Sequence, residues 1–360
     1  MGNKVLMKGN EAVAEAAIRS GCRLYFAYPI TPQSELIEYM AKMMPKVNGT
    51  FLQAESEVAA INMVYGAAGM GKRVMTSSSS PGVSLKMEGI SYLAGARLPA
   101  VIINVQRGGP GLGDIQPAQG DYFQATKGGG HGDYHLIVLA PSSVQEFADM
   151  ASDSFDLADK YRVPVMILSD GLLGQMMEPV EFKEYKTDKE IEELGKQHYD
   201  WCIHTNEDGK GHHHNEINSL EIDPNVLERH VLNLEQIYKE IEKNEVKHEE
   251  YNINDNNEFV CVAFGTAARI VKSAIDDLNA EGRNIGLIRP ITVWPYPYKE
   301  IAKTIHGNVK RVFVFELNLG QMVEDVKLAV NGKVPVEFMG KVGGLVFTPE
   351  EIKEKIKAYL

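Results

Sequence analysis

Three side chains that could take part in chemistry stand beside the expected ends of strands or helices. Glu57 follows Ser56, a residue that can cap the helix expected over 56–69. A carboxylate there can transfer a proton, but the helix dipole also stabilises it, and position alone favours that structural role. Arg107 follows a strand expected over 100–105, and a guanidinium can hold a carboxylate in a bidentate fork. Thr31 offers a hydroxyl between two prolines, Pro29 and Pro32.

Two loops accompany these side chains. In the segment 28–33, the two prolines indicate a rigid loop at the carboxyl edge of a sheet, although a simple strand-to-helix turn is the alternative. The serine-rich run 76–82 leaves an expected strand and enters a helix, and a flexible serine loop is its alternative. The glycines after Arg107 let backbone approach a ligand closely. No Gly-Lys-Ser/Thr follows them, which argues against a nucleotide site.

The elements that must position these groups alternate between strands and helices. Apolar continuity with little period-2 alternation predicts a parallel sheet buried on both faces. A helix that Asn10 caps is expected through Ile18, and Ser143 can cap a helix over 144–158. The order implies an open α/β sheet. Its expected strands are 24–27, 50–53, 73–77, 100–105, 136–140 and 165–169.

We expect the chain to divide at residues 180 and 258. The segment 181–258 is polar and charged, which predicts an inter-domain linker or insert that is partly helical over 224–245. A second α/β unit is expected over 259–360. Its expected strands are 259–264, 284–288, 311–316 and 334–338, and its expected helices are 267–279, 298–306 and 321–330.

Composition limits the classes of function. The formal net charge of -12 argues against nucleic acid or an anionic membrane as a partner, because both require basic patches. No segment approaches the roughly 18 uninterrupted apolar residues of a membrane span, and the first residues lack a signal-peptide core. We therefore expect a cytoplasmic protein.

Cysteine and histidine do not predict a metal site. The chain has 3 cysteines, Cys22, Cys202 and Cys261, and they lie too far apart for a disulfide framework or an iron–sulfur motif. The run His212–His214 lies in the polar segment without a spaced set of further ligands, so a solvated loop is favoured. We expect no metal ligands in this chain.

An ordered set of motifs resembles the alpha subunit of the 2-oxoacid:ferredoxin oxidoreductases, nearest the 2-oxoisovalerate (3-methyl-2-oxobutanoate) branch. The resemblance covers nearly the whole chain and is weakest over 180–255. It implies a thiamine-diphosphate pyrimidine-binding domain with a doubly wound parallel sheet, followed by a domain like the transketolase C-terminal domain. The motifs are Tyr28-Pro29-Ile30-Thr31-Pro32, Glu55-Ser56-Glu57, Thr76 to Gly82, Gln106-Arg107-Gly108-Gly109-Pro110, His131-Gly132-Asp133 and Ser169-Asp170-Gly171.

The resemblance implies roles for these residues. Glu57 would hydrogen-bond N1′ of the aminopyrimidine and favour the tautomer whose N4′ removes the proton from thiazolium C2. Glu55 is the rival for that role, but the small residues Ala59 and Ala60 match the register of Glu57. Thr31, Arg107 and Gly108 would bind the 2-oxoacid. The other expected cofactor contacts are Tyr28, Pro29, Ile30, Ser79, Ser80, Pro81 and Gly82.

The magnesium-binding Gly-Asp-Gly of thiamine enzymes is missing from all 360 residues. The resemblance therefore implies a beta subunit that holds the diphosphate, Mg²⁺ and iron–sulfur clusters. Gamma and ferredoxin-like delta subunits would complete the complex, with coenzyme A as acyl acceptor and ferredoxin as electron acceptor. Asp170 and Gly171 are expected to shape the edge of the fold.

The substrate is inferred from the loop after Arg107. Members specific for 2-oxoglutarate carry Ser-Thr-Gly where this chain has Gly111-Leu112-Gly113, and the acidic Asp114 and Asp121 follow. An acidic loop with no added base is a poor receptor for a second carboxylate, so a monocarboxylic branched 2-oxoacid is favoured. A 2-oxoglutarate enzyme and a non-catalytic scaffold subunit stay open as alternatives.

Overall fold

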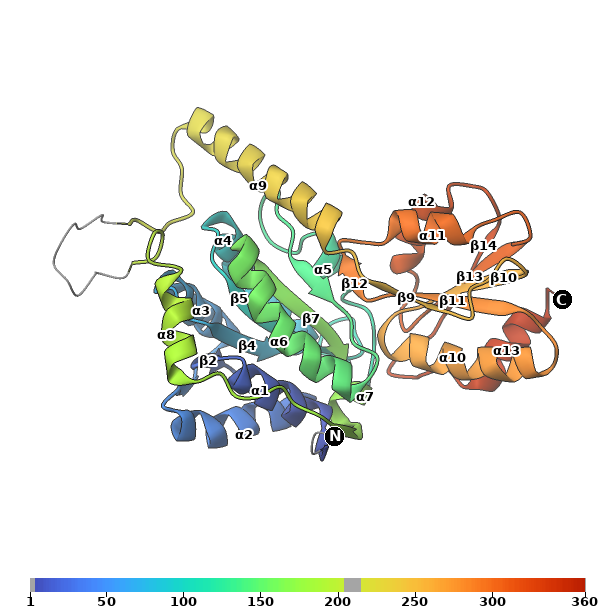
Figure 1. The fold of residues 1–360 in the computed structure, drawn as a ribbon, viewed down its shortest axis with the longest axis horizontal. Coiled ribbons are helices and arrows are strands. Elements are labelled where there is room, and N and C mark those ends of the chain that lie inside the picture. The colour runs from blue at the N-terminus through green and yellow to red at the C-terminus, as the bar shows by residue number, and fades with distance from the viewer. Residues whose placement is uncertain (1–3, 204–214, 360) are drawn as a thin grey trace.

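A computed structural model describes residues 4–203 and 215–359, and the histidine run 212–214 lies outside them. Two α/β units lie side by side, with the chain crossing from one to the other near residue 245 (Figure 1). The first contains a 7-stranded sheet and the second a 5-stranded sheet. The mixed α/β class with parallel sheets is therefore confirmed.

The first sheet has the strand order β12-β6-β7-β5-β4-β2-β3, and it is parallel except for β12. All six strands expected in the first unit are confirmed within one or two residues at each end. The strands of this sheet are β2 (Leu24–Ala27), β3 (Thr50–Gln53), β4 (Val74–Ser78), β5 (Ala100–Gln106), β6 (Ile137–Leu139), β7 (Pro164–Asp170) and β12 (Thr292–Trp294). A separate antiparallel pair joins β1 (Val5–Lys8) to β8 (Met177–Val180).

Helices cover both faces of this sheet (Figure 1). They are α1 (Gly9–Arg19), α2 (Ser34–Met43), η1 (Met44–Val47), α3 (Glu57–Gly69), α4 (Ser80–Gly95), α5 (Tyr122–Thr126), α6 (Val144–Tyr161) and α7 (Gly171–Gln175).

Two of three expected helix caps are confirmed. The Ser56 hydroxyl accepts from the Ala59 amide at 3.2 Å, and the Ser143 hydroxyl accepts from the Glu146 amide at 3.1 Å. The expected cap at Asn10 is wrong, because α1 begins two residues earlier, with Lys8 as its N-cap. Asn10 lies buried inside the helix and donates instead to the Pro32 carbonyl at 2.8 Å.

The polar segment 181–258 contributes to both units. Its helices are α8 (Asp188–Lys196) and α9 (Pro224–Asn244), which confirms the helix expected over 224–245. Buried Leu234, Tyr238 and Ile241 attach α9 to the core of the first unit. β9 (His248–Tyr251) then pairs antiparallel with β11 of the second sheet.

The second sheet has the order β14-β13-β10-β11-β9 and confirms the four strands expected there. Its elements are β10 (Phe259–Val262), α10 (Gly265–Ala280), β11 (Ile285–Pro290), α11 (Tyr298–Thr304), β13 (Arg311–Glu316), α12 (Met322–Val330), β14 (Val336–Gly340) and α13 (Pro349–Lys357).

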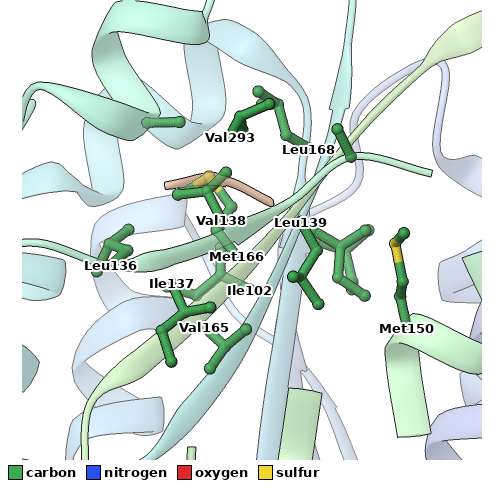
Figure 2. Packing of buried hydrophobic residues seen from close by; sticks show 14 of the residues in the cluster. Ile102, Leu136, Ile137, Val138, Leu139, Met150, Val165, Met166, Leu168 and Val293 are labelled. Atoms are coloured by element: carbon green, nitrogen blue, oxygen red, sulfur yellow. The ribbon is translucent and has the colours of Figure 1, made fainter. Parts of the chain in front are cut away.

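One strand from the C-terminal part lies in the N-terminal sheet. β12 pairs antiparallel with β6, and its Val293 lies beside Leu168 and Val138 in the buried cluster of the first unit (Figure 2). At the same junction, the buried Asp325 accepts from the Tyr122 hydroxyl at 2.7 Å and from the Lys127 ammonium at 2.5 Å. Shared core and polar contacts therefore bind the two units together.

Candidate active site

The expected site residues gather at one edge of the first sheet. β3, β2, β4 and β5 are neighbours and run parallel, so their carboxyl ends meet at the same edge. Glu57 follows β3, the loop 28–33 follows β2, the serine run ends β4, and Arg107 follows β5. Strand order thus brings together four segments that are far apart in the sequence.

Glu57 lies inside this edge. It is the first residue of α3, and its side chain is only 6% exposed. Within the part of the chain that the structure describes, no hydrogen-bond donor reaches its carboxylate. Its oxygens are not among the fully buried polar atoms, so they keep some contact with solvent. The site therefore has an acceptor ready for a bound molecule.

Glu55, the rival carboxylate, is placed differently. It is exposed, and one of its oxygens accepts from the Ser56 hydroxyl at 3.0 Å. Its environment is that of a solvated surface group, whereas Glu57 faces the interior. The two side chains therefore differ in their exposure to water, and a proton-transfer group works best where water is largely excluded.

Gly82 lies directly against the Glu57 carboxylate. A Cβ at Gly82 would lie 2.7 Å from Glu57 Oε1 and 2.2 Å from the Ser78 hydroxyl. The hydroxyls of Ser78 and Ser79 are buried and have no hydrogen-bond partner. The missing side chain at Gly82 thus lets the Glu57 carboxylate approach the serine run, whose hydroxyls at Ser78 and Ser79 lack partners.

Ser80 is engaged in a network of its own. Its hydroxyl donates to Asp121 at 2.6 Å, and Asn104 donates to the same carboxylate at 2.9 Å. Burial raises the pKa of Asp121 above its usual value, while these two hydrogen bonds act in the opposite direction. The network fixes the start of α4 to the end of β5.

Arg107 and Thr31 lie together. One guanidinium nitrogen of Arg107 donates to the Thr31 carbonyl at 3.0 Å and another donates to the Leu112 carbonyl at 2.9 Å, while Nε is buried and without a partner. The charge thus meets only neutral carbonyl groups, and no carboxylate of the described chain neutralises it. Tyr28 and Pro29 in the same loop are exposed.

The neighbouring loops serve the fold. A Cβ at Gly108 would lie 2.6 Å from Asp114, which explains the absence of a side chain there. Asp170 caps α7 by accepting from the amides of Leu172 at 2.9 Å and Leu173 at 3.2 Å, as its expected structural role requires.

Sequence reasoning missed Lys86. It lies on α4, is completely buried, and donates to the Thr76 hydroxyl at 2.5 Å and to the Ser77 carbonyl at 3.1 Å. Burial lowers the pKa of Lys86 to about 7, and the negative charge of Glu57 acts against that shift. The signal was available in the sequence, because this lysine stands between apolar Leu85 and Met87 four residues after the serine run.

These features define a class: an α/β protein whose parallel sheet presents, at its carboxyl edge, a largely buried carboxylate and a guanidinium bonded only to neutral carbonyls. Residues 15–243 match the model for the thiamine-diphosphate-binding domain of pyruvate flavodoxin/ferredoxin oxidoreductases, and residues 257–352 match core domain II of pyruvate:ferredoxin oxidoreductase. The chain belongs to this family of thiamine-diphosphate-binding oxidoreductase subunits.

Curated relatives extend over the whole chain. The ketoisovalerate oxidoreductase subunit VorB of Methanothermobacter thermautotrophicus is 47% identical, over 98% of this chain and 97% of its own length. The 2-oxoglutarate synthase subunit KorA of Methanocaldococcus jannaschii is 36% identical, over 97% of this chain and 98% of its own length.

Solved structures agree with this assignment. The 2-oxoglutarate:ferredoxin oxidoreductase of Magnetococcus marinus, solved with 2-oxoglutarate, coenzyme A and succinyl-CoA bound, matches with a TM-score of 0.82 and 27% identity. The match covers 99% of this chain and 65% of that one, so this chain spans a little under two thirds of its length. A split-gene transketolase shares the fold, with a TM-score of 0.58 and 11% identity, over 99% of this chain and 98% of that one.

The site fits half of thiamine diphosphate. The donor-free Glu57 carboxylate beside Gly82 and the unsatisfied Ser78 and Ser79 hydroxyls suit a flat heterocycle that carries both donors and acceptors. Residues 4–203 and 215–359 contain no group of three His, Cys, Asp or Glu side chains that could hold a metal ion. No helix in these ranges has the length and apolarity needed to cross a membrane.

Proposed function

We propose that this chain is the alpha subunit of a complex that oxidatively decarboxylates a branched-chain 2-oxoacid, 2-oxoisovalerate, to its acyl-CoA and passes the electrons to ferredoxin. The observation that carries this proposal is the shielded Glu57 carboxylate, which faces Gly82 without a donor. The name and the 47% identity of the ketoisovalerate oxidoreductase subunit support the substrate.

In this proposal the bound thiamine diphosphate supplies the carbanion chemistry that decarboxylation of a 2-oxoacid requires. Glu57 accepts a hydrogen bond from N1′ and stabilises a proton there. Burial strengthens that interaction, because water does not compete for the carboxylate. Gly82 gives the heterocycle room, and the serine hydroxyls orient it. Tyr28, Pro29, Ile30 and Ser79 to Pro81 form the rest of the proposed pocket.

Arg107 holds the substrate carboxylate in the proposed complex. Its guanidinium makes hydrogen bonds only to neutral carbonyls, so its positive charge is available. The Thr31 carbonyl and the Gly108 backbone hold the arginine and its loop at the pocket edge, and the Thr31 hydroxyl faces the 2-oxo group. The exposed Leu112 and Ile115, 82% and 54% exposed, add apolar surface to the same loop. This pattern suits a branched monocarboxylic acid better than a dicarboxylic acid.

Partner subunits complete the proposed enzyme. A beta subunit holds the diphosphate, Mg²⁺ and iron–sulfur clusters, while gamma and ferredoxin-like delta subunits and ferredoxin receive the electrons. The apolar helix α3 presents Val58 and Met63 to the outside, 42% and 36% exposed, beside exposed Leu52. Apolar surface next to an incomplete cofactor site is typical of a subunit interface.

The test is to purify the complex with its partner chains and compare 2-oxoacids as substrates for coenzyme-A-dependent dye reduction. We expect the highest kcat/KM for 2-oxoisovalerate, followed by other branched monocarboxylic acids. A preference for 2-oxoglutarate would move the chain to the 2-oxoglutarate branch. An Arg107→Ala complex that keeps full activity would favour the scaffold alternative.

A further inference from the structure

We propose that Lys86 is a positioning residue for the reaction of this site: its buried ammonium group supplies the counter-charge of the Glu57 carboxylate before and while a cofactor binds. This inference rests on the proposed function for the role of Glu57. It assigns a task to a lysine that contacts neither the proposed substrate residues nor the surface.

The packing of α3 against α4 places Lys86 on the side of α4 that faces α3. Gly82 contacts the Glu57 carboxylate. Two turns further along α4, a Cβ at Gly89 would lie 2.5 Å from Ile61. Ile61 stands one turn after Glu57 on α3, so the two helices run along each other at this point. Lys86 lies between Gly82 and Gly89 on the contacting side of α4.

The surroundings of Lys86 hold its ammonium group in place with neutral acceptors. β4 contributes the Thr76 hydroxyl and the Ser77 carbonyl. Thr76 in turn donates to the Phe26 carbonyl at 2.6 Å, so its hydroxyl oxygen is oriented as an acceptor for Lys86. Two hydrogen bonds fix the position of the group but leave its charge uncompensated.

Glu57 is the charged group, among the described residues, whose field acts on Lys86. The other titratable groups nearby are engaged or distant: Tyr25 shares its hydroxyl with Ser77, Asp121 is held by Ser80 and Asn104 at the start of α4, and Glu88 is exposed. Glu57 is therefore the counter-charge of Lys86, and an opposite charge offsets part of the cost of burying an ammonium group.

The consequence for chemistry follows from this pairing. The negative charge of Glu57 stabilises a proton at N1′, and an opposite charge nearby generally favours the ionised form of a carboxylate. Lys86 would act through Glu57 and would not touch the reacting atoms.

The first test uses the full chain without cofactor and measures thermal unfolding of wild type, Glu57→Gln, Lys86→Met and the double variant. Methionine keeps the length of the side chain and removes the charge. We expect Glu57→Gln to lower the midpoint, because Lys86 then lacks its counter-charge, and the added Lys86→Met to restore it. Additive effects, or a double variant no more stable than Glu57→Gln, would overturn the pairing.

The second test uses the assembled complex and measures deuterium exchange at C2 of bound thiamine across pH. We expect the acid limb of the Lys86→Met profile to move up by about one pH unit or more, as loss of one opposite charge predicts. Lys86→Met should have no further effect in a Glu57→Gln background. An unmoved acid limb, or an equal added loss in that background, would overturn the role.

A matched control separates charge from hydrogen bonding. Thr76→Val removes the hydroxyl that accepts from Lys86 but leaves both charges, so its acid limb should stay with wild type. If Thr76→Val shifts the limb as far as Lys86→Met, the effect is structural and the inference fails. Coupling in the unfolding cycle with no exchange in wild type would instead contradict the proposed function and leave the pairing supported.

Discussion

At the scale of the residue, the central feature is a carboxylate without a donor at the start of a helix. Replacement of Glu57 by Gln keeps its size but removes the charge that favours a proton at N1′. Proton-transfer assistance is typically worth ~10²–10⁴ in rate. We expect the assembled Glu57→Gln complex to lose C2 exchange and turnover by about that factor while its subunits still associate.

Glu55→Gln is the matched control, because Glu55 is exposed and bound to Ser56. Its loss should be far smaller. If Glu55→Gln slows C2 exchange and Glu57→Gln does not, Glu55 is the catalytic carboxylate. If neither variant slows it, this edge of the sheet does not bind the pyrimidine.

A substitution at Gly82 tests whether the cofactor lies between Glu57 and the serine run. In Gly82→Ala the new methyl group would meet the Ser78 hydroxyl and the Glu57 carboxylate, which are movable ends of side chains, so the fold should survive. The carboxylate must shift, and we expect thiamine diphosphate affinity of the assembled complex to fall at least about tenfold, the loss that 1.4 kcal/mol produces. Titration calorimetry of the complex measures it.

Gly66→Ala is its control, since a Cβ there meets nothing within 4 Å. Helix propensity predicts that Gly66→Ala gains up to about 1 kcal/mol in the isolated chain. Equal affinities of Gly82→Ala and wild type for thiamine diphosphate would show that the cofactor does not lie against Gly82 and Glu57.

Lys86 also predicts how stability depends on pH. Its pKa is lowered to about 7 in the folded chain, against about 10.4 in an unfolded chain. Between these values the unfolded chain binds more protons, so the Lys86 contribution to the free energy of unfolding rises with pH. Relative to Lys86→Met, wild type should gain stability from pH 7 to 10 and show a constant difference below that range. Denaturant unfolding at several pH values checks the slope, and parallel curves would contradict it.

At the scale of the element, caps and strand ends determine where side chains point. α6 begins after Ser143, whose hydroxyl accepts from the Glu146 amide. Ser143→Ala should cost about 1 kcal/mol in the free energy of unfolding, as the loss of such a cap usually does. Urea denaturation of the chain measures the change.

Ser273→Ala, at an exposed position within α10, is the control and should be neutral or slightly stabilising because alanine favours helix. A Ser143→Ala variant as stable as wild type would mean that the neighbouring Ser142 and Glu146 pair is sufficient to hold the helix start.

At the scale of the whole molecule, we propose that the chain supplies one half of a cofactor site. It lacks the magnesium-binding Gly-Asp-Gly of thiamine enzymes, and in our proposal the diphosphate and metal contacts of a partner subunit supply most of the grip on the cofactor. The isolated chain should therefore bind thiamine diphosphate weakly or not at all, whereas the complex with its beta subunit should bind it tightly. Calorimetry of the lone chain that shows tight, magnesium-dependent binding would contradict this expectation.

The sequence by itself determined the class of fold and the positions of the main strands along the chain. Buried parallel strands leave a continuous apolar run, and β5 and β13 were predicted with almost no error for that reason. Short edge strands leave no such run. β1, β8, β9 and β12 were therefore not predicted, and β12 joins a sheet whose other strands precede it by more than a hundred residues.

The tertiary structure decided which groups face each other. Sequence spacing could not show that Thr31 and Arg107 meet through a backbone carbonyl, that Asn10 points to Pro32, or that Ser80 binds Asp121. Nor could it show that Lys86 is completely buried, because a lysine on a helix is usually solvated. Local periodicity is encoded along the chain, whereas the burial of a charge depends on the packing of two helices against one strand.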